Sequence, residues 1–148
     1  MQTIDLTQRP PRSPRVRLGG YALLPRMLDK CRAALAGNVG EYHYDCPLDQ
    51  RFFYFTGIDP SVLKEEVAKG LGDGAILAWI HENAPIKREE WEIAQWSSFR
   101  EAAAPGDNES RVFLNDQLAE AGAAEREDIM TWFDYIDLDD HVSFGGEA

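Results

Sequence analysis

Residues 24–37 read LPRMLDKCRAALAG, and this stretch decides the fold class. Its apolar side chains recur at the spacing of one face of an α-helix. Pro25 suits the first turn of such a helix, and Gly37 suits the position just after its last turn. The segment therefore predicts an amphipathic helix. Its apolar stripe consists of Leu24, Leu28, Cys31 and Leu35.

Further stretches toward the C-terminus repeat this pattern of an apolar stripe between helix start and stop signals. Start signals include Pro47, Asp59 with Pro60, and Asp73, while Pro105-Gly106 is a stop. No internal repeat has a fixed period. The sequence therefore predicts one all-α domain of about seven helices over residues 1–148. The stretches cover residues 47–57, 59–70, 73–84, about 87–104, 107–122 and the region around 129–136.

The first 20 residues cannot form a helix. Pro10, Pro11 and Pro14 lack amide donors and push the preceding residues into extended geometry, and Gly19-Gly20 interrupts any regular element. We expect an extended, basic arm over residues 1–20, a helical body over 21–137 and a polar tail over 138–148.

Charge is divided unevenly along the chain, which has a formal net charge of −11. Residues 1–32 carry seven cations and two acids, a net charge of +5, and the remainder carries −16. Opposite charges favour an arm that folds back onto its own body. A polyanion-binding arm would have the same composition, but an acidic body repels nucleic acid, so we disfavour that partner.

Cysteine content and hydropathy bear on location. Cys31 and Cys46 are too few for a disulfide framework, and without a secretion signal we interpret them as reduced thiols. No apolar stretch approaches the ~20 residues that span a bilayer. We therefore expect a cytoplasmic protein with no membrane partner.

Two long strings carry a resemblance to a known family. The run DLTQRPPRSPR at residues 5–15, followed by LGGY at 18–21, resembles the opening of a family of small bacterial proteins of unknown function. The likeness continues through LPRMLDK at 24–30 and GEYHYDCPLDQR at 40–51. It is looser beyond residue 59, through Trp79, the 91–96 region and Trp132. The resemblance implies a bacterial, cytoplasmic origin and transfers no activity, substrate or catalytic residue.

The most suggestive polar cluster lies at residues 41–49. If residues 40–46 are extended, Tyr42 and Tyr44 face one way and Glu41, His43 and Asp45 face the other. Those three side chains are candidate metal ligands, since imidazole and carboxylates bind metals or move protons. In the simpler interpretation they hydrogen-bond the loop and cap the helix that follows. The candidate catalytic residues are His43, Asp45, Cys46 and Asp49.

Cys46 precedes a predicted helix start, where a thiol can become a nucleophile, although it fits equally well as a small buried apolar residue. Guanidinium groups bind carboxylate or phosphate through paired hydrogen bonds, so the spaced arm arginines make an anion site possible. They could instead clamp acids of the body such as Asp29, Asp45 or Asp49. The candidate ligand-binding residues are Arg12, Arg15, Arg17, Tyr42, His43, Tyr44 and Arg51.

Nucleotide-binding glycine motifs are absent from the sequence, and no cofactor is indicated. The four tryptophans, with Phe52, Phe53 and Phe55, fall at helical spacing and are expected to pack in the core. The leading hypothesis is a small binding or regulatory module, in which the arm and the Glu41–Arg51 segment form a polar pocket for an anion or a protein partner. The alternatives are a small enzyme that uses His43 and neighbouring carboxylates, and a structural protein in which the arm clasps an oligomer.

Overall fold

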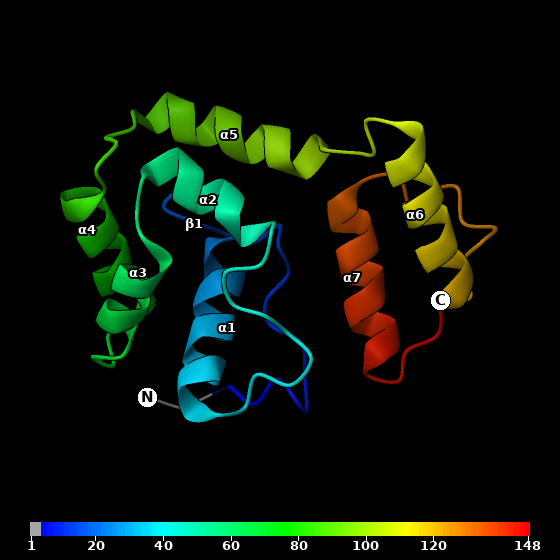
Figure 1. Cartoon of the computed structure of the whole chain (residues 1–148), viewed down its shortest axis with the longest axis horizontal. Coiled ribbons are helices and arrows are strands. Elements are labelled where there is room, and N and C mark those ends of the chain that lie inside the picture. The colour runs from blue at the N-terminus through cyan, green and yellow to red at the C-terminus, as the bar shows by residue number, and fades with distance from the viewer. Residues whose placement is uncertain (1–3) are drawn as a thin grey trace.

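The computed structural model describes residues 4–148, and the first three residues of the expected arm lie outside them. The described chain is helical apart from one short hairpin (Figure 1), which confirms the predicted all-α class. Its elements are β1 (Arg17–Leu18), β2 (Tyr21–Ala22), α1 (Leu24–Ala36), α2 (Asp49–Thr56), α3 (Pro60–Val67), α4 (Asp73–Asn83), α5 (Glu90–Ala102), α6 (Asn108–Glu120) and α7 (Trp132–Ser143).

Helix α1 lies at the centre of the molecule (Figure 1) and begins and ends where its sequence signals predict. Gly37 follows the last turn with φ +77°, a left-handed conformation that glycine adopts without steric cost, and its N–H contacts the carbonyls of Ala33 and Ala34. Leu24, Leu28 and Cys31 are fully buried, whereas Leu35 is 43% exposed. The expected stripe therefore stops one turn early, because the last turn projects beyond the core.

The arm ends in a hairpin, which the sequence analysis did not foresee. Strands β1 and β2 pair antiparallel, with Arg17 opposite Ala22. Gly19 and Gly20 form the connecting loop with φ values of +58° and +84°, a pair of positive values that matches the twist of a two-residue hairpin. An added Cβ on Gly19 would lie 2.5 Å from Leu77 Cδ1, so this turn is also packed tightly against α4.

The main hydrophobic core gathers β2 and helices α1 to α5, with Phe133 contributed by α7. Aromatic edges meet at its centre, with ring centroids of Tyr21 and Phe52 5.2 Å apart and those of Phe52 and Trp96 6.3 Å apart. Such edge-to-face pairs add stabilisation beyond the area that they bury. Phe52 is fully buried, as expected, but Trp91 is 63% exposed, so the expectation that all four tryptophans pack in the core is wrong for Trp91.

A second, smaller hydrophobic cluster lies between α6 and α7, beyond the Pro105-Gly106 link. It is built from Leu114 and Leu118 on α6, Ala123, and Leu138 on α7. Figure 1 shows α5 running from the α3–α4 side of the molecule toward this pair. The structure therefore has two hydrophobic clusters, and α7 contributes to both.

Helix α7 extends further than expected. It begins after Thr131, whose side chain accepts a hydrogen bond from the Asp134 N–H while the Asp134 carboxylate accepts one from the Thr131 N–H. This capping box fixes the start. The helix then continues through the buried residues Leu138 and Asp140 to Ser143. The boundary of the polar tail at residue 138 is therefore wrong, because this acidic sequence finds partners on the body.

No helix within residues 4–148 is both long and apolar enough to cross a lipid bilayer.

Candidate functional site

Helix α1 carries three charged side chains that are almost completely buried. Arg26, Asp29 and Lys30 are 6%, 0% and 4% exposed. A buried charge without a partner is costly, and pairing with hydrogen-bonded opposite charges offsets this cost. Each of the three therefore needs a partner from another segment, and those partners determine how the chain folds around α1.

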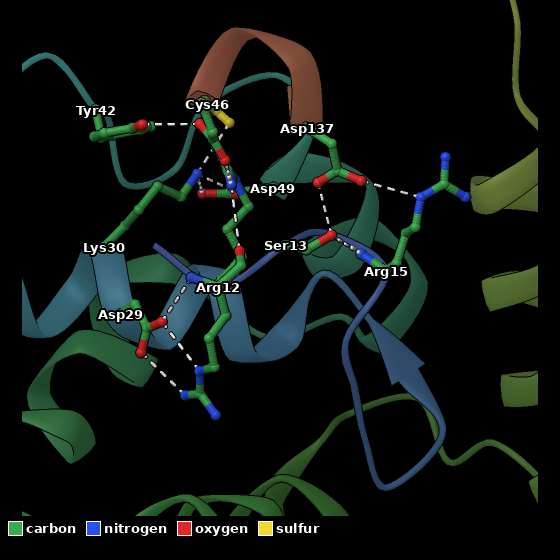
Figure 2. Close-up of polar contacts among 11 residues, drawn as sticks. Arg12, Ser13, Arg15, Asp29, Lys30, Tyr42, Cys46, Asp49 and Asp137 are labelled. Atoms are coloured by element: carbon green, nitrogen blue, oxygen red, sulfur yellow. Dashed lines mark hydrogen bonds and ion pairs between the residues drawn. The ribbon is translucent and has the colours of Figure 1, made fainter. Parts of the chain in front are cut away.

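Asp29 anchors the arm (Figure 2). Its carboxylate accepts hydrogen bonds from the backbone N–H of Arg12 at 2.9 Å and from the guanidinium of Arg12 at 3.0 Å. Arg12 also reaches Asp73 at the start of α4, and Arg32 joins that carboxylate from α1, both at 2.8 Å. Burial acts to raise the pKa of Asp73, but the hydrogen bonds from the two arginines outweigh it and lower that pKa.

The next arm residues bind α7 instead. Ser13 Oγ donates to Asp137 at 2.7 Å, and Arg15 Nε donates to the same carboxylate at 3.1 Å (Figure 2). Arg15 also pairs with Asp134. Arg17 pairs with Glu101 on α5 at 3.0 Å. The arm arginines therefore act on three different parts of the body and do not converge on one anion.

Arg26 connects α1 to α7. Its guanidinium donates to both oxygens of Asp140, at 2.7 and 3.2 Å. Tyr42 OH donates to Asp140 at 2.8 Å, and the Arg26 guanidinium lies 5.4 Å from the centre of the Tyr42 ring. Burial, the hydrogen bond to Asp140 and the charge of that carboxylate raise the pKa of Tyr42.

Lys30 connects α1 to α2, one turn along the helix from Arg26. Its ammonium lies 2.9 and 2.8 Å from the two carboxylate oxygens of Asp49 and 3.4 Å from Cys46 Sγ (Figure 2). Asp49 also accepts the backbone N–H of Asp45 at 3.0 Å. This bond holds the end of the 37–48 loop, the segment between α1 and α2, in place.

A cavity of about 580 Å³ lies among these pairs. Four segments line it: the arm, α1, the 37–48 loop with the start of α2, and the C-terminal half of α7 with its end. Its walls combine apolar, hydroxyl, imidazole, thiol and charged groups. The lining residues are Leu6, Thr7, Arg26, Lys30, Gly40, Glu41, Tyr42, His43, Cys46, Leu48, Asp49, Ile136, Asp139, Ser143 and Phe144.

Charge in this cavity is net negative. Arg26 and Lys30 are neutralised by their carboxylate partners, whereas Glu41 and Asp139 form no ion pair within residues 4–148. Partial burial and the neighbouring Asp140 charge raise the pKa of Asp139, while Arg26 opposes this effect. Burial contributes most to this rise in the Asp139 pKa, and the charge of Asp140 raises it by more than Arg26 lowers it.

The structure gathers only part of the predicted site. Glu41, Tyr42, His43, Cys46 and Asp49 line the cavity. Burial alternates over residues 41–46 as expected, with the tyrosines more buried than their neighbours, but the segment forms turns and no strand. These turns include Asp45, whose φ is +63°.

Other predicted residues lie elsewhere. Tyr44 OH donates to the Pro60 carbonyl at 2.7 Å, and its ring packs beside the main core, where burial above all raises its pKa. Asp45 and the three arm arginines do not line the cavity, and Arg51 is exposed on α2. Among residues 4–148, no group of three His, Cys, Asp or Glu side chains is placed to hold a metal ion, so the expected Glu41, His43 and Asp45 set does not form.

Several lining residues were not anticipated, above all Arg26 and Lys30. The sequence held one sign of them. Arg26 and Lys30 lie four residues apart, on the same side of a helix, and Asp29 lies between them. This charged strip borders the apolar face of the helix. Such charges could be solvent-exposed as easily as buried. The places of Asp139 and Phe144 in the cavity wall could not be predicted, because both residues lie in the segment that was expected to be a polar tail.

Comparison with protein families identifies the chain. The model of a domain of unknown function, DUF5069, matches residues 8–142. The protein belongs to this family. The expected membership of a family of unknown function is thereby confirmed, and the matched range includes α1, the 37–48 loop and most of α7, which form three walls of the cavity. A search of curated proteins finds no match.

Proposed function

We propose that this protein is a small binding module whose ligand site is the cavity between the arm, α1, the 37–48 loop and α7. The observation that carries the proposal is that a space of about 580 Å³ opens among four segments, at the place where their buried ion pairs fix them. Cavities of several hundred Å³ with a few convergent polar groups are typical ligand sites.

The net negative charge of the cavity wall favours a cationic ligand. It does not favour the anion that was considered from the spacing of the arm arginines. The guanidinium groups of Arg12, Arg15 and Arg17 are occupied by carboxylates, and the cations in the cavity wall are paired. Glu41 and Asp139 remain to attract a positive group, and Leu6, Leu48, Ile136 and Phe144 supply apolar contact. The proposed ligand is therefore a small organic amine with an apolar body.

A matched pair of probes tests this proposal. Phenethylamine and hydrocinnamate share an aromatic body and differ in the charge of the head group. We expect the amine to raise the melting temperature and the acid to have no effect, because only a bound native state gains stability. Asp139→Asn and Glu41→Gln should each weaken binding by about tenfold, corresponding to about 1.4 kcal/mol. Glu65→Gln changes an exposed carboxylate outside the cavity and should bind as the parent does. Equal binding of both probes would contradict the proposal.

A second candidate function is thiol-dependent catalysis. It is favoured by the placement of His43 and Cys46 on the wall of the same cavity, with the Lys30 ammonium 3.4 Å from Cys46 Sγ. A thiol beside a cation and a base is a common nucleophile. Turnover of p-nitrophenyl acetate that is lost in Cys46→Ser and in His43→Ala would support this function. Equal hydrolysis by the parent and both variants would exclude it.

A cytoplasmic location belongs to the same proposal. It is supported by Cys31 and Cys46, which are both free thiols in the structure.

A further inference from the structure

A second surface lies across α2 and α5. It shares no lining residue with the cavity. An open groove of about 740 Å³ runs along α5, and Phe55 of α2 forms its side. Trp91 and Phe99 are 63% and 64% exposed there. Large aromatic side chains are rarely this exposed together on one helix without a binding role.

The groove is held rigid by its inner residues. The rings of Phe55 and Trp96 are stacked with centroids 5.2 Å apart and planes 16° apart, so α2 and α5 are locked side by side, as Figure 1 shows. Arg88 also lies over the Phe55 ring, with its guanidinium 4.2 Å from the ring centre, and it pairs with Glu92. A partner would therefore meet a preformed aromatic surface, which lowers the entropy lost on binding.

Two arginines without carboxylate partners lie at one end of this groove. Arg100 stacks on Phe99, 4.6 Å from the ring centre, and its Nε is buried with no hydrogen-bond acceptor. Arg51 is exposed on α2, one turn before Phe55. Within residues 4–148, neither forms an ion pair, although arginines elsewhere, such as Arg12 and Arg26, do.

The two arginines also act on one another. Burial, and then the nearby charge of Arg51, lower the pKa of Arg100. In a chain of net charge −11, carboxylates are abundant, yet none within residues 4–148 forms an ion pair with either cation. A carboxylate brought by a partner would offset the charge of these two guanidinium groups and reduce the repulsion between them.

We propose that the α2–α5 surface, defined as Arg51, Phe55, Trp91, Trp96, Phe99 and Arg100, docks a short acidic segment of a partner protein that carries aromatic or aliphatic side chains. The rings bind the apolar side chains and the two guanidinium groups bind the carboxylates. A nucleic acid fits less well, because its continuous phosphate charge would meet the strongly acidic remainder of the body.

Fluorescence anisotropy with a short fluorescein-labelled peptide that repeats Glu-Leu-Phe-Glu tests this proposal. We expect binding to the full chain, and roughly tenfold weaker binding to Arg51→Glu and to Trp91→Ala, which remove an ionic and an aromatic contact. Arg111→Glu and Met130→Ala are the matched controls, since Arg111 is exposed on α6 and Met130 is exposed in the loop before α7. They should bind as the parent does.

Two altered peptides separate the contributions. Replacing each Glu by Lys, or each Leu and Phe by Ala, should abolish binding. The proposal is overturned if the Lys peptide binds equally well, or if Arg51→Glu and Trp91→Ala bind like the parent. It is also overturned if a single-stranded oligonucleotide or an anionic phosphatidylserine vesicle is bound more tightly through the same residues, or if sedimentation shows that these residues serve self-association.

Discussion

Arg26 of α1 and Asp140 of α7 form a buried ion pair with two hydrogen bonds, of 2.7 and 3.2 Å, and their side chains are only 8% and 9% exposed. This pair joins α1, which belongs to the main core, to α7, which also packs in the α6–α7 cluster, and Arg26 lines the proposed ligand cavity. This contact therefore helps to set the position of α7, and with it the shape of the cavity, together with the bonds from the arm to Asp137 and the burial of Phe133.

Removing Arg26 should destabilise the protein strongly. Arg26→Leu leaves the Asp140 carboxylate buried with Tyr42 as its remaining partner, so we expect a loss of about 3–5 kcal/mol in the free energy of unfolding, measured by urea denaturation. Adding Asp140→Leu should restore most of it, because the buried charge is then gone. Arg126→Ala breaks an exposed pair with Asp128 and should change the free energy of unfolding little, because water screens this pair. A loss from Arg26→Leu no larger than this control would refute the account of α7.

Ser97 offers a test of how the hairpin is attached. Its buried hydroxyl accepts the Ala22 N–H at 2.8 Å and donates to the Gly20 carbonyl at 2.5 Å. Ser97→Ala leaves the Ala22 N–H unpaired and should cost about 1–3 kcal/mol in urea denaturation. The exposed neighbour Ser98 is the matched control, and Ser98→Ala should change stability by less than about 0.5 kcal/mol. Equal effects of the two variants would count against this role of the hydroxyl.

Acid should weaken the anchoring of the arm. The pKa of Asp73 is lowered in the folded protein, because hydrogen bonds from Arg12 and Arg32 outweigh its burial. The unfolded chain therefore binds a proton first as the pH falls below about 4, and the stabilisation from Asp73 is lost as the pH falls through the folded pKa. Asp73→Asn should show a smaller loss of stability between neutral pH and about pH 3 than the parent. Parallel stability curves for the two proteins would contradict this assignment.

The two thiols should differ in reactivity. Burial raises the pKa of Cys31 to about 11, whereas Cys46 borders the cavity. The thiolate is the reactive form. With Ellman's reagent at pH 8, we expect the folded protein to react at Cys46 and to react at Cys31 only after denaturation; Cys46→Ser should remove the first reaction. Labelling of Cys31 in the folded protein would show that α1 is less protected than the structure indicates.

Much of the fold could be predicted from local sequence patterns. The caps and stripe of α1, Asp59 as the N-cap of α3, and the stop at Pro105-Gly106 are local signals, and helices form close to where they indicate. The end of α7 was missed because Asp139 and Asp140 resemble a solvated tail. Asp140 is buried because Arg26, 114 residues away in the chain, and Tyr42 both donate hydrogen bonds to it.

The candidate site was predictable only in part for the same reason. Tyr42, His43 and Cys46 lie in one short segment, and their clustering is visible in the sequence. The partners of the arm arginines could not be predicted from the sequence, since many acids could have paired with them. Arg15 pairs with Asp134 and Asp137 on α7, so it supplies no unpaired cation to the cavity, where an anion site would need one.

The most direct test of the central claim is a two-dimensional amide NMR titration of the labelled protein with phenethylamine. The proposed site predicts dose-dependent shifts at Thr7, Gly40, Tyr42 and Ser143, which border the cavity from the arm, the 37–48 loop and the end of α7. The same titration with hydrocinnamate should leave these signals unchanged. Shifts confined to the α2–α5 surface, or none at saturating amine, would contradict the claim that the cavity binds a small amine.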